Sequence, residues 1–324
     1  MASKIRFLLP LILISFFTCA QIKDSLTITT QTFKINDSTE YTYSRPRIID
    51  LVRYIPDDLV GFGKFTIQKE NLKWDALTIG STLAIIPYDQ KILEDSEKLG
   101  HRIGGWDKLS RYKRVLGIEI VPTSISSGVY YFGNGNTTLL LSGFFYAVGK
   151  IGKDDYRALN TSSELIEVLL AVGVATQTVK RISGRESPVA ATQDGGAWRP
   201  FPSFSAYASE TPKHDAMPSG HIATYVATLT VIATNYPEIK WIKPVGYTLG
   251  AALAFNMVSG KVHWASDYPL GIFIGYVIGK EAANRRITKN VKPSIEIPHQ
   301  TKYKTSYNYN RFNNTNLLGM TITF

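Results

Sequence analysis

The sequence predicts an all-α protein built around a bundle of about six helices, with irregular or short-β extensions at its N- and C-terminal ends. Apolar residues make up 44% and charged residues 19% of the 324 residues, which is too apolar for a disordered chain. Between residues 75 and 284, apolar segments without charge alternate with short polar or basic links. Alanine, leucine, isoleucine and small residues dominate these segments, a composition typical of closely packed helices.

The first twenty residues have the pattern of a secretory signal peptide. Lys4 and Arg6 form a basic end, residues 7–17 are apolar, and Ala20 ends a small-residue cleavage site. Cys19 is the only cysteine, so cleavage after Ala20 would leave no disulfide. A short membrane anchor and a lipid on Cys19 are the less favoured alternatives. We therefore expect an exported protein of the bacterial cell envelope, either periplasmic or membrane-associated.

Residues 21–74 are expected to be an N-terminal extension with little regular structure. Threonine, serine and aspartate are frequent there, and weak alternation over residues 25–35 would suit one strand. Pro46, Pro56 and the glycines around residue 62 interrupt the segment.

The predicted helical domain covers residues 75–284, and its helices correspond to apolar segments. These are residues 76–88, 120–132, 137–149, 168–179, 222–237, 244–260 and 268–279. Most are shorter than the roughly 17–25 residues of a membrane-spanning helix, so their length does not decide between a soluble and a membrane bundle. Basic residues in the links favour membrane association.

Residues 285–324 form the predicted C-terminal tail, which is basic at first and then rich in tyrosine and asparagine. Its last residues alternate as in an edge strand. The net charge of the whole chain is +10, which favours anionic partners: a phosphorylated small molecule, a phosphorylated lipid, or a membrane surface. Because no nucleic-acid-binding module accompanies this charge, we expect no nucleic-acid partner.

The first informative motif is Pro-Ser-Gly-His at residues 218–221, directly before an apolar segment. Ser219 is a good N-cap, so a helix is expected to begin here. Free backbone N–H groups at a helix N-terminus bind anions, and Gly220 allows a phosphate to approach the backbone closely. His221 would then lie at the mouth of an anion site, although an ordinary capped helix with an incidental histidine has the same sequence.

A second histidine, His263, lies four residues before Asp267. Residues 266–269 indicate another helix start, which leaves His263 on the preceding loop within reach of Asp267. A carboxylate on one imidazole nitrogen fixes the tautomer and makes the other nitrogen a better nucleophile. A metal-ligand pair or a structural contact is the alternative. No histidine or cysteine cluster supplies further ligands, so we expect no metal and no cofactor.

A third segment places Lys180, Arg181 and Arg185 at the end of an apolar segment. Cations in this position can hold phosphate oxygens. They can equally cap a helix C-terminus or flank a membrane segment. Taken alone, this cluster favours the second interpretation.

In order and spacing, the three segments together resemble the type 2 phosphatidic acid phosphatase (PAP2) superfamily, which includes vanadium-dependent haloperoxidases and class A bacterial acid phosphatases. The family motifs are Lys-x6-Arg-Pro, Pro-Ser-Gly-His and Ser-Arg-x5-His-x3-Asp. The second motif is intact here, the third keeps His263 and Asp267, and the first keeps Lys180 and Pro188. The resemblance covers roughly residues 115–284, with the motif-bearing core at 163–284, and implies the helical bundle of the family.

The resemblance also implies a metal-independent phosphatase that hydrolyses phosphomonoesters or pyrophosphates, above all those of lipids, through a phosphohistidine. His263 would attack phosphorus, Asp267 would orient the His263 ring, and His221 would protonate the leaving oxygen. The groups implied to bind the phosphate are Lys180, the Ser219 hydroxyl and the Gly220 backbone N–H.

The sequence departs from the family at both motif arginines, which fall on Ser187 and Met257. Arginine binds phosphate strongly and often through two hydrogen bonds, so another cation is expected to replace them. Arg185 is the first candidate, followed by Lys261 and Arg199.

Two other function classes share these motifs. A vanadium-dependent haloperoxidase would bind vanadate at His263. A non-catalytic envelope protein with a degraded phosphate site would explain the two missing arginines. We rank the haloperoxidase below the phosphatase because the extra cationic contacts that hold vanadate are fewer here. We rank the non-catalytic protein lower because His221, His263 and Asp267 are all present.

Overall fold

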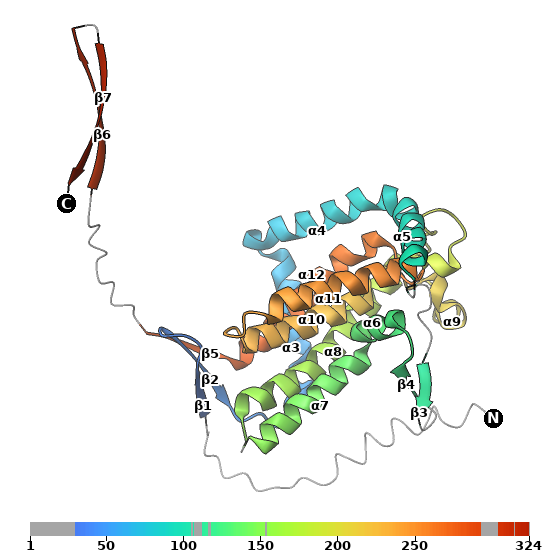
Figure 1. Cartoon of the computed structure of the whole chain (residues 1–324). Helices are drawn as coiled ribbons and strands as arrows, with labels where there is room; N and C mark the ends of the chain where they lie inside the picture. Colours follow the sequence, from blue (N-terminus) through green and yellow to red (C-terminus); the bar gives the residue numbers. More distant parts are fainter. Residues whose placement is uncertain are drawn as a thin grey trace.

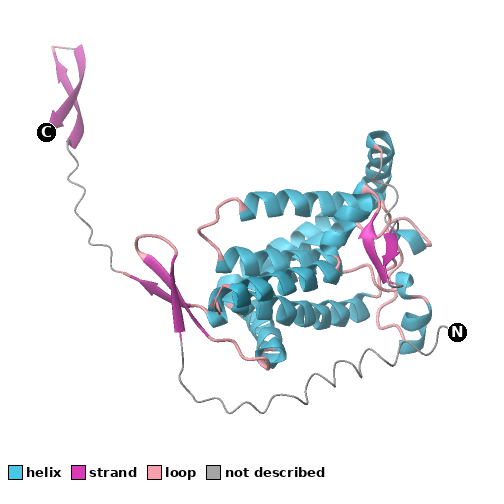
Figure 2. Ribbon diagram, turned by 60° about the horizontal axis from the view of Figure 1, so that its bottom comes forward, coloured by secondary structure: helices cyan, strands magenta, loops and turns pink. Residues whose placement is uncertain are grey.

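Long helices that run side by side form the centre of the molecule (Figure 1). The predicted all-α bundle with short-β extensions is confirmed, since the strands lie at its margins (Figure 2). The signal peptide predicted for residues 1–20, with Cys19, lies outside the described residues. The computed structural model describes residues 30–104, 106, 112–115, 118–152, 154–292, 304–313 and 315–323.

Six long helices coincide with predicted apolar segments. They are α4 (Leu72–Ile85), α7 (Gly135–Ile151), α8 (Tyr156–Ser183), α10 (Gly220–Asn235), α11 (Ile242–Ser259) and α12 (Tyr268–Arg286). The remaining predicted segment, residues 120–132, is divided between strand β4 (Ile118–Pro122) and helix α6 (Ile125–Gly133). Ser124 separates the two, because its side chain caps α6 by accepting a hydrogen bond from the Ser127 backbone N–H.

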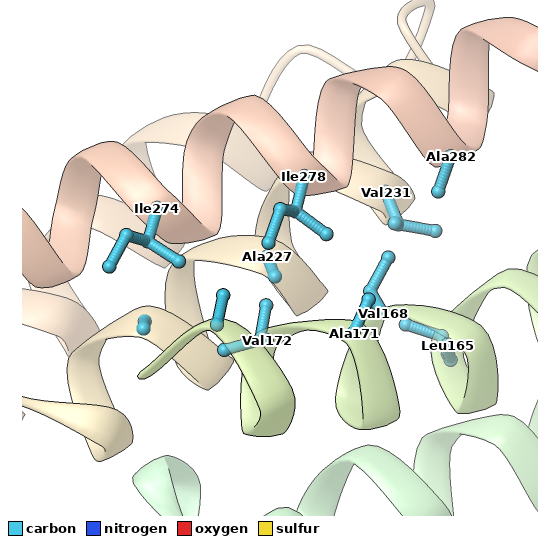
Figure 3. Close-up of a cluster of buried hydrophobic side chains, with 11 residues drawn as sticks. Leu165, Val168, Ala171, Val172, Ala227, Val231, Ile274, Ile278 and Ala282 are labelled. Carbon is cyan, nitrogen blue, oxygen red and sulfur yellow. The ribbon is translucent and has the colours of Figure 1, made fainter. Parts of the chain in front are cut away.

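The hydrophobic core lies between α8, α10 and α12. Small and branched side chains from one face of each helix meet there and are almost completely buried (Figure 3). Burial of each larger side chain stabilises the fold by about 1.5–3 kcal/mol. The labelled core residues are Leu165, Val168, Ala171, Val172, Ala227, Val231, Ile274, Ile278 and Ala282.

Helix α12 approaches α10 through Gly271, Gly275 and Gly279, which share one face because they are four residues apart. A Cβ atom on Gly275 would lie 2.2 Å from the Ala223 carbonyl oxygen, and one on Gly271 would lie 2.8 Å from the Ser219 carbonyl oxygen. The two backbones are therefore in direct contact. This contact brings the loop before α12 next to the N-terminus of α10.

Helical structure begins at α2 (Asp50–Arg53), inside the segment expected to be an irregular extension at residues 21–74. Helix α3 (Ile55–Ile67) follows, and its Phe62 and Phe65 rings pack edge-on against Phe273 of α12. Pro56 was expected to break the chain here. It lies in the first turn of α3, where its missing N–H costs no helical hydrogen bond.

Helix α5 (Asp89–Ile103) was not anticipated either, because charged residues are spread along its whole length and leave no apolar segment. Only Asp89, Leu93 and Gly100 are buried, and the helix packs against α11. The short helix α9 (Phe204–Ser209) lies in the connection between α8 and α10.

Three small antiparallel sheets complete the fold. Strand β2 pairs with both β1 and β5, so the start of the described chain is joined to the end of α12. The hairpin of β6 and β7 is exposed along its whole length and lies in the predicted tail (Figure 1). The strand bounds are β1 (Thr30–Lys34), β2 (Thr39–Ser44), β3 (Tyr112–Val115), β4 (Ile118–Pro122), β5 (Thr288–Val291), β6 (Lys304–Phe312) and β7 (Thr315–Thr323).

The outward faces of α4 and α7 are apolar. Every exposed residue at positions 76–88, on α4 and the turn after it, is uncharged, and the same is true of positions 139–148 on α7. Among the described residues, one helix, α8, is long and apolar enough to cross a membrane, and 72% of its apolar stretch is buried inside the bundle.

Candidate active site

The N-terminus of α10 forms one side of the candidate site. The Ser219 hydroxyl accepts a hydrogen bond from the Ile222 backbone N–H at 3.3 Å, which confirms the predicted N-cap. Lys180, in the last turn of α8, is buried beside this helix end, because a Cβ on Gly220 would lie 3.8 Å from its Nζ. A hydroxyl, an ammonium group and the positive end of a helix dipole thus converge.

His221 and His263 meet at this helix end, although 42 residues separate them in sequence. His221 Nδ1 lies 3.4 Å from His263 Nε2, and the two rings are edge to face with centroids 5.6 Å apart. The ring of Tyr130, in α6, packs against the His221 ring, and the two ring centroids are 4.8 Å apart. Sequence analysis did not single out Tyr130, which has no motif around it.

Asp267 lies at the opposite nitrogen of the His263 ring. Its Oδ2 is 3.5 Å from His263 Nδ1, which makes no hydrogen bond within the described residues. The same Oδ2 accepts a hydrogen bond from the Trp264 backbone N–H at 2.8 Å. Both His263 and Asp267 are buried. A carboxylate at Nδ1 favours the tautomer with its proton there, which leaves a lone pair on Nε2 facing His221.

Arg185, expected as the first replacement for a phosphate-binding arginine, has a different place in the structure. Its side chain is completely buried, and its five N–H groups have five hydrogen bonds to the protein. Nη1 donates to Ser266 Oγ at 2.6 Å and to Asp267 Oδ1 at 2.8 Å, and Nη2 donates to Asp89 Oδ2 at 2.7 Å. Gly195 O accepts the remaining two. No N–H is left for a phosphate.

Asp89 is a residue of this site that sequence reasoning missed. It begins α5 and is completely buried, 96 residues from Arg185 in sequence. Its Oδ1 accepts a hydrogen bond from the Ser266 backbone N–H at 3.0 Å. An aspartate at the start of a charged helix is an ordinary first-turn residue, so no local signal distinguishes it.

A second carboxylate, Asp215, lies on the phosphate side of the site. Its Oδ2 is 3.6 Å from Lys180 Nζ, and its Oδ1 accepts a hydrogen bond from the Ser187 hydroxyl at 3.2 Å. The position of the first missing arginine is therefore occupied by a serine that binds an acid. The cationic side of the site is correspondingly weaker than the motifs alone would suggest.

The remaining candidate cations are paired with acids elsewhere. Lys261 Nζ is 2.9 Å from Glu97 Oε1, and Arg199 forms an ion pair with Glu186. Met257, at the position of the second missing arginine, is fully buried among apolar side chains.

The pKa of His221 is clearly shifted from its ordinary value. Burial, and then the neighbouring His263 and Lys180, lower its pKa to about 3. In the free protein His221 is therefore neutral at ordinary pH. Two imidazole rings that face a common space, beside an ammonium group and a helix N-terminus, can divide phosphoryl transfer between them: one attacks phosphorus and the other passes a proton to the leaving oxygen.

Within the described residues, there is no group of three or more histidine, cysteine, aspartate or glutamate side chains that could hold a metal ion.

Comparison with known proteins identifies the segment that holds most of this site. Residues 163–289 match the model of the PAP2 superfamily. For this segment, the match bears out the resemblance to the PAP2 superfamily that the motifs indicated. The matched segment contains every predicted site residue, whereas Asp89 and Tyr130 lie outside it.

A lipid A 1-phosphatase of Porphyromonas gingivalis is 31% identical to this chain over 67 residues. The similarity spans 20% of this chain and only 15% of that relative. A crystal structure of a transmembrane PAP2 type phosphatidylglycerolphosphate phosphatase from Bacillus subtilis aligns with a TM-score of 0.46 and 13% sequence identity. That alignment covers 66% of this chain and 94% of the other.

Proposed function

We propose that this PAP2 protein is a phosphatase that hydrolyses phosphomonoesters or pyrophosphates of lipids through a phosphohistidine on His263. The arrangement of His221, His263 and Asp267 is the observation that supports it most directly. The ring nitrogens of the pair face each other at 3.4 Å, and a carboxylate lies 3.5 Å from the far nitrogen of His263.

In the first step, His263 Nε2 attacks phosphorus while the bond from phosphorus to the leaving oxygen breaks. The Nδ1 proton stays on the Asp267 side, so that the ring gains positive charge beside a carboxylate. The leaving oxygen takes a proton through His221. Lys180, the Ser219 hydroxyl and the Gly220 N–H bind the phosphoryl oxygens.

In the second step, water attacks the phosphohistidine, the N–P bond breaks, and His221 accepts the proton of the attacking water. His221 then passes this proton to the inorganic phosphate, which leaves, and both histidines return to their starting state. No step of this scheme uses a metal ion. Unchanged phosphate release after dialysis against a chelator is the expected result, and activity restored only by added divalent metal would contradict the scheme.

A long apolar groove supports a lipid as the substrate. The groove has a volume of about 470 Å³ and lies between α10, α11 and α12. Ile222 and Tyr268, which follow His221 and Asp267 in the chain, line one end, and Lys243 and Lys280 line the other. From Ile222 to Thr234 the α10 side of the groove is ~18 Å long, enough for much of an acyl or prenyl chain whose phosphate lies at the histidines.

The apolar outward faces of α4 and α7 support membrane association. Together with the signal peptide predicted for residues 1–20, they favour an exported protein that acts on lipids of the cell envelope. The name of the lipid A 1-phosphatase described above also indicates a phosphorylated lipid as its substrate.

The deciding experiment measures phosphate release from a panel of lipid and soluble phosphoesters. The panel contains phosphatidate, phosphatidylglycerol phosphate, a polyprenyl pyrophosphate, lipid A and a soluble aryl phosphate. We expect His263→Ala to abolish release and His221→Ala to reduce it about 10²–10⁴-fold, with unchanged circular dichroism. Full activity of folded His263→Ala would refute the proposal, and vanadate-dependent halide oxidation without phosphatase activity would favour a haloperoxidase.

A further inference from the structure

A buried chain of charges connects the start of α5 with the carboxylate behind His263. We propose that Asp89 and Arg185 are positioning residues that set the orientation and reactivity of His263 by holding Asp267. This inference rests on the proposed function, in which His263 attacks phosphorus.

The chain runs through one guanidinium group. Arg185 donates to Asp267 Oδ1 at 2.8 Å and to Asp89 Oδ2 at 2.7 Å, and all three side chains are fully buried. Trp198 and Trp264 flank the guanidinium at 4.9 and 5.4 Å from its central carbon. Buried on all sides and bonded through every N–H, Arg185 holds the Asp267 carboxylate in one orientation, with Oδ2 toward His263.

Asp89 fixes the same carboxylate by a second route. Its Oδ1 accepts a hydrogen bond from the Ser266 backbone N–H at 3.0 Å, and its Oδ2 accepts one from the Ser266 hydroxyl. Ser266 directly precedes Asp267 in a single helical turn. Asp89 therefore anchors the backbone that presents Asp267, besides sharing Arg185 with it.

The charges of this set determine the field at His263. Asp89 and Asp267 each contribute −1 and Arg185 contributes +1, so a net charge of −1 faces Nδ1. On the other side of the His263 ring are His221, with Lys180 and Tyr130 next to it. The Tyr268 hydroxyl donates to the Ala254 carbonyl oxygen, away from the pair. Changing Asp89 or Arg185 thus changes the charge at His263 by one unit in opposite directions.

Stability alone gives a weak reason for such a set. Desolvation of buried ions offsets most of their mutual attraction, and apolar replacements of whole buried ion clusters are often neutral or stabilising. A function in orienting the nucleophile accounts for a carboxylate that reaches the site from α5.

The test compares Asp89→Asn, Arg185→Met and the double variant Asp89→Asn/Arg185→Met. The double variant restores the net charge and keeps Ser266 held, because the asparagine oxygen can accept from its N–H. Glu238→Gln is the matched control, since it breaks the Arg157–Glu238 ion pair at the opposite end of α8 and α10. For each variant, kcat, KM and the pH profile of kcat/KM are measured with a soluble aryl phosphate.

We expect both single variants to lower kcat about 10²-fold with little change in KM, because they misplace the nucleophile without touching phosphate. The acidic limb of the profile should move by about one pH unit to lower pH in Asp89→Asn and to higher pH in Arg185→Met. In the double variant the limb should return to the wild-type position while kcat stays low, because Asp267 still lacks its guanidinium donor. The control should behave as wild type.

The inference would be overturned if the acidic limbs of the two single variants moved in the same direction or did not move. It would also be overturned if the double variant had the wild-type kcat. Either result would leave Asp89 and Arg185 a merely structural role. If Arg185→Met does not fold, Asp89→Asn and the double variant still decide. Nitrogen-15 spectra of the ring nitrogens, with the His263 signals identified among five histidines by His263→Ala, provide a readout that needs no activity. Inactive wild type would refute the proposed function, whereas an active wild type with unchanged His263 tautomer in all variants would refute this inference alone.

Discussion

At the scale of single residues, the two histidines of the pair differ in what faces them. His263 has a carboxylate at Nδ1, whereas His221 has Lys180 nearby and no carboxylate within ion-pair distance among the described residues. Opposite surroundings of this kind separate the tasks of two titratable groups. His263 is suited to become cationic during attack, and His221 is suited to pass a proton on rather than to hold one.

The pH dependence of the reaction should show where that proton comes from. Because the pKa of His221 is lowered to about 3, the free enzyme does not supply it between pH 5 and 8. In the proposed mechanism the substrate monoanion supplies the proton, and the second pKa of a phosphomonoester is about 6. On the alkaline side of the profile, we therefore expect kcat/KM to fall about tenfold per pH unit above this value.

Two soluble phosphoesters with different second pKa values provide the control for this prediction. The alkaline break in kcat/KM should follow the substrate. A break that stays at one pH for both substrates would mean that an enzyme group holds the proton instead.

Asp215 should weaken phosphate binding, because it places a negative charge 3.6 Å from Lys180 Nζ. We expect Asp215→Asn to lower the inhibition constant of inorganic phosphate by about tenfold, and Lys180→Met to reduce kcat/KM by about 10²–10³-fold. Glu210→Gln, which removes the surface partner of Lys213, is the control. Weaker phosphate inhibition in Asp215→Asn would show that Asp215 orients Lys180 rather than competing with phosphate.

At the scale of helices, the contact between α10 and α12 decides whether the pair can form. His221 is in the first turn of α10, and Asp267 directly precedes α12. Because Gly271, Gly275 and Gly279 let the two backbones touch, the ends of these helices are held at a fixed distance. The active-site geometry is thus set by packing along the whole length of both helices.

Enlarging the glycine contact should damage stability and catalysis together. In Gly275→Ala the new methyl group would lie 2.2 Å from the Ala223 carbonyl oxygen, so the helices must separate. We expect a loss of about 1–3 kcal/mol in unfolding free energy and a fall of about 10²-fold in kcat. Chemical denaturation and phosphate release measure the two effects.

Gly143 on α7 is the matched control, because a Cβ there would meet nothing within 4 Å. Gly143→Ala should leave activity unchanged and stabilise the helix by up to ~1 kcal/mol. An equal loss of stability and kcat in both variants would mean that the effects do not come from the contact between α10 and α12.

Much of the fold could be predicted from the sequence, because all the long apolar segments except residues 120–132 coincide with long helices. Helix α3 could not, since a proline in a first turn and a proline in a turn look alike. At the site, Ser219 and His221 were recognisable because a cap and its helix are neighbours in sequence. The position of Asp89 in the site could not be predicted, nor could the use of every Arg185 N–H within the protein. Both require α5 to fold onto a loop far along the chain, and no local pattern encodes that contact.

At the scale of the whole molecule, the apolar faces of α4 and α7 and the groove between α10, α11 and α12 favour contact with lipid. Single exposed apolar side chains are normal on a protein surface, whereas a continuous apolar face indicates a contact site. Ile222 and Tyr268, which line one end of the groove, directly follow His221 and Asp267 in the chain.

Charged substitutions on α7 should separate membrane binding from catalysis. Leu140 and Phe144 are 61% and 58% exposed and lie one helical turn apart. We expect Leu140→Glu/Phe144→Glu to reduce flotation with anionic vesicles and hydrolysis of vesicle-bound phosphatidate about tenfold or more. Hydrolysis of a soluble aryl phosphate should be unchanged.

Ile48→Glu is the control for that experiment, since Ile48 is 72% exposed but lies outside both helices. Unchanged flotation of the α7 variant would show that this face does not contact the membrane.

The pairing of β2 with β5 has a consequence for the newly made chain. Across this pair the Asn290 side-chain amide donates a hydrogen bond to the Thr42 hydroxyl, and the two residues are 248 positions apart in sequence. During synthesis, β1 and β2 can pair as soon as both have been made. The N–H and C=O groups on the other edge of β2 stay unpaired until β5, which follows α12, has been made. An open strand edge promotes association with other chains. A chain that stops before residue 288 would keep this edge, so the last small strand distinguishes a finished molecule from an unfinished, aggregation-prone one.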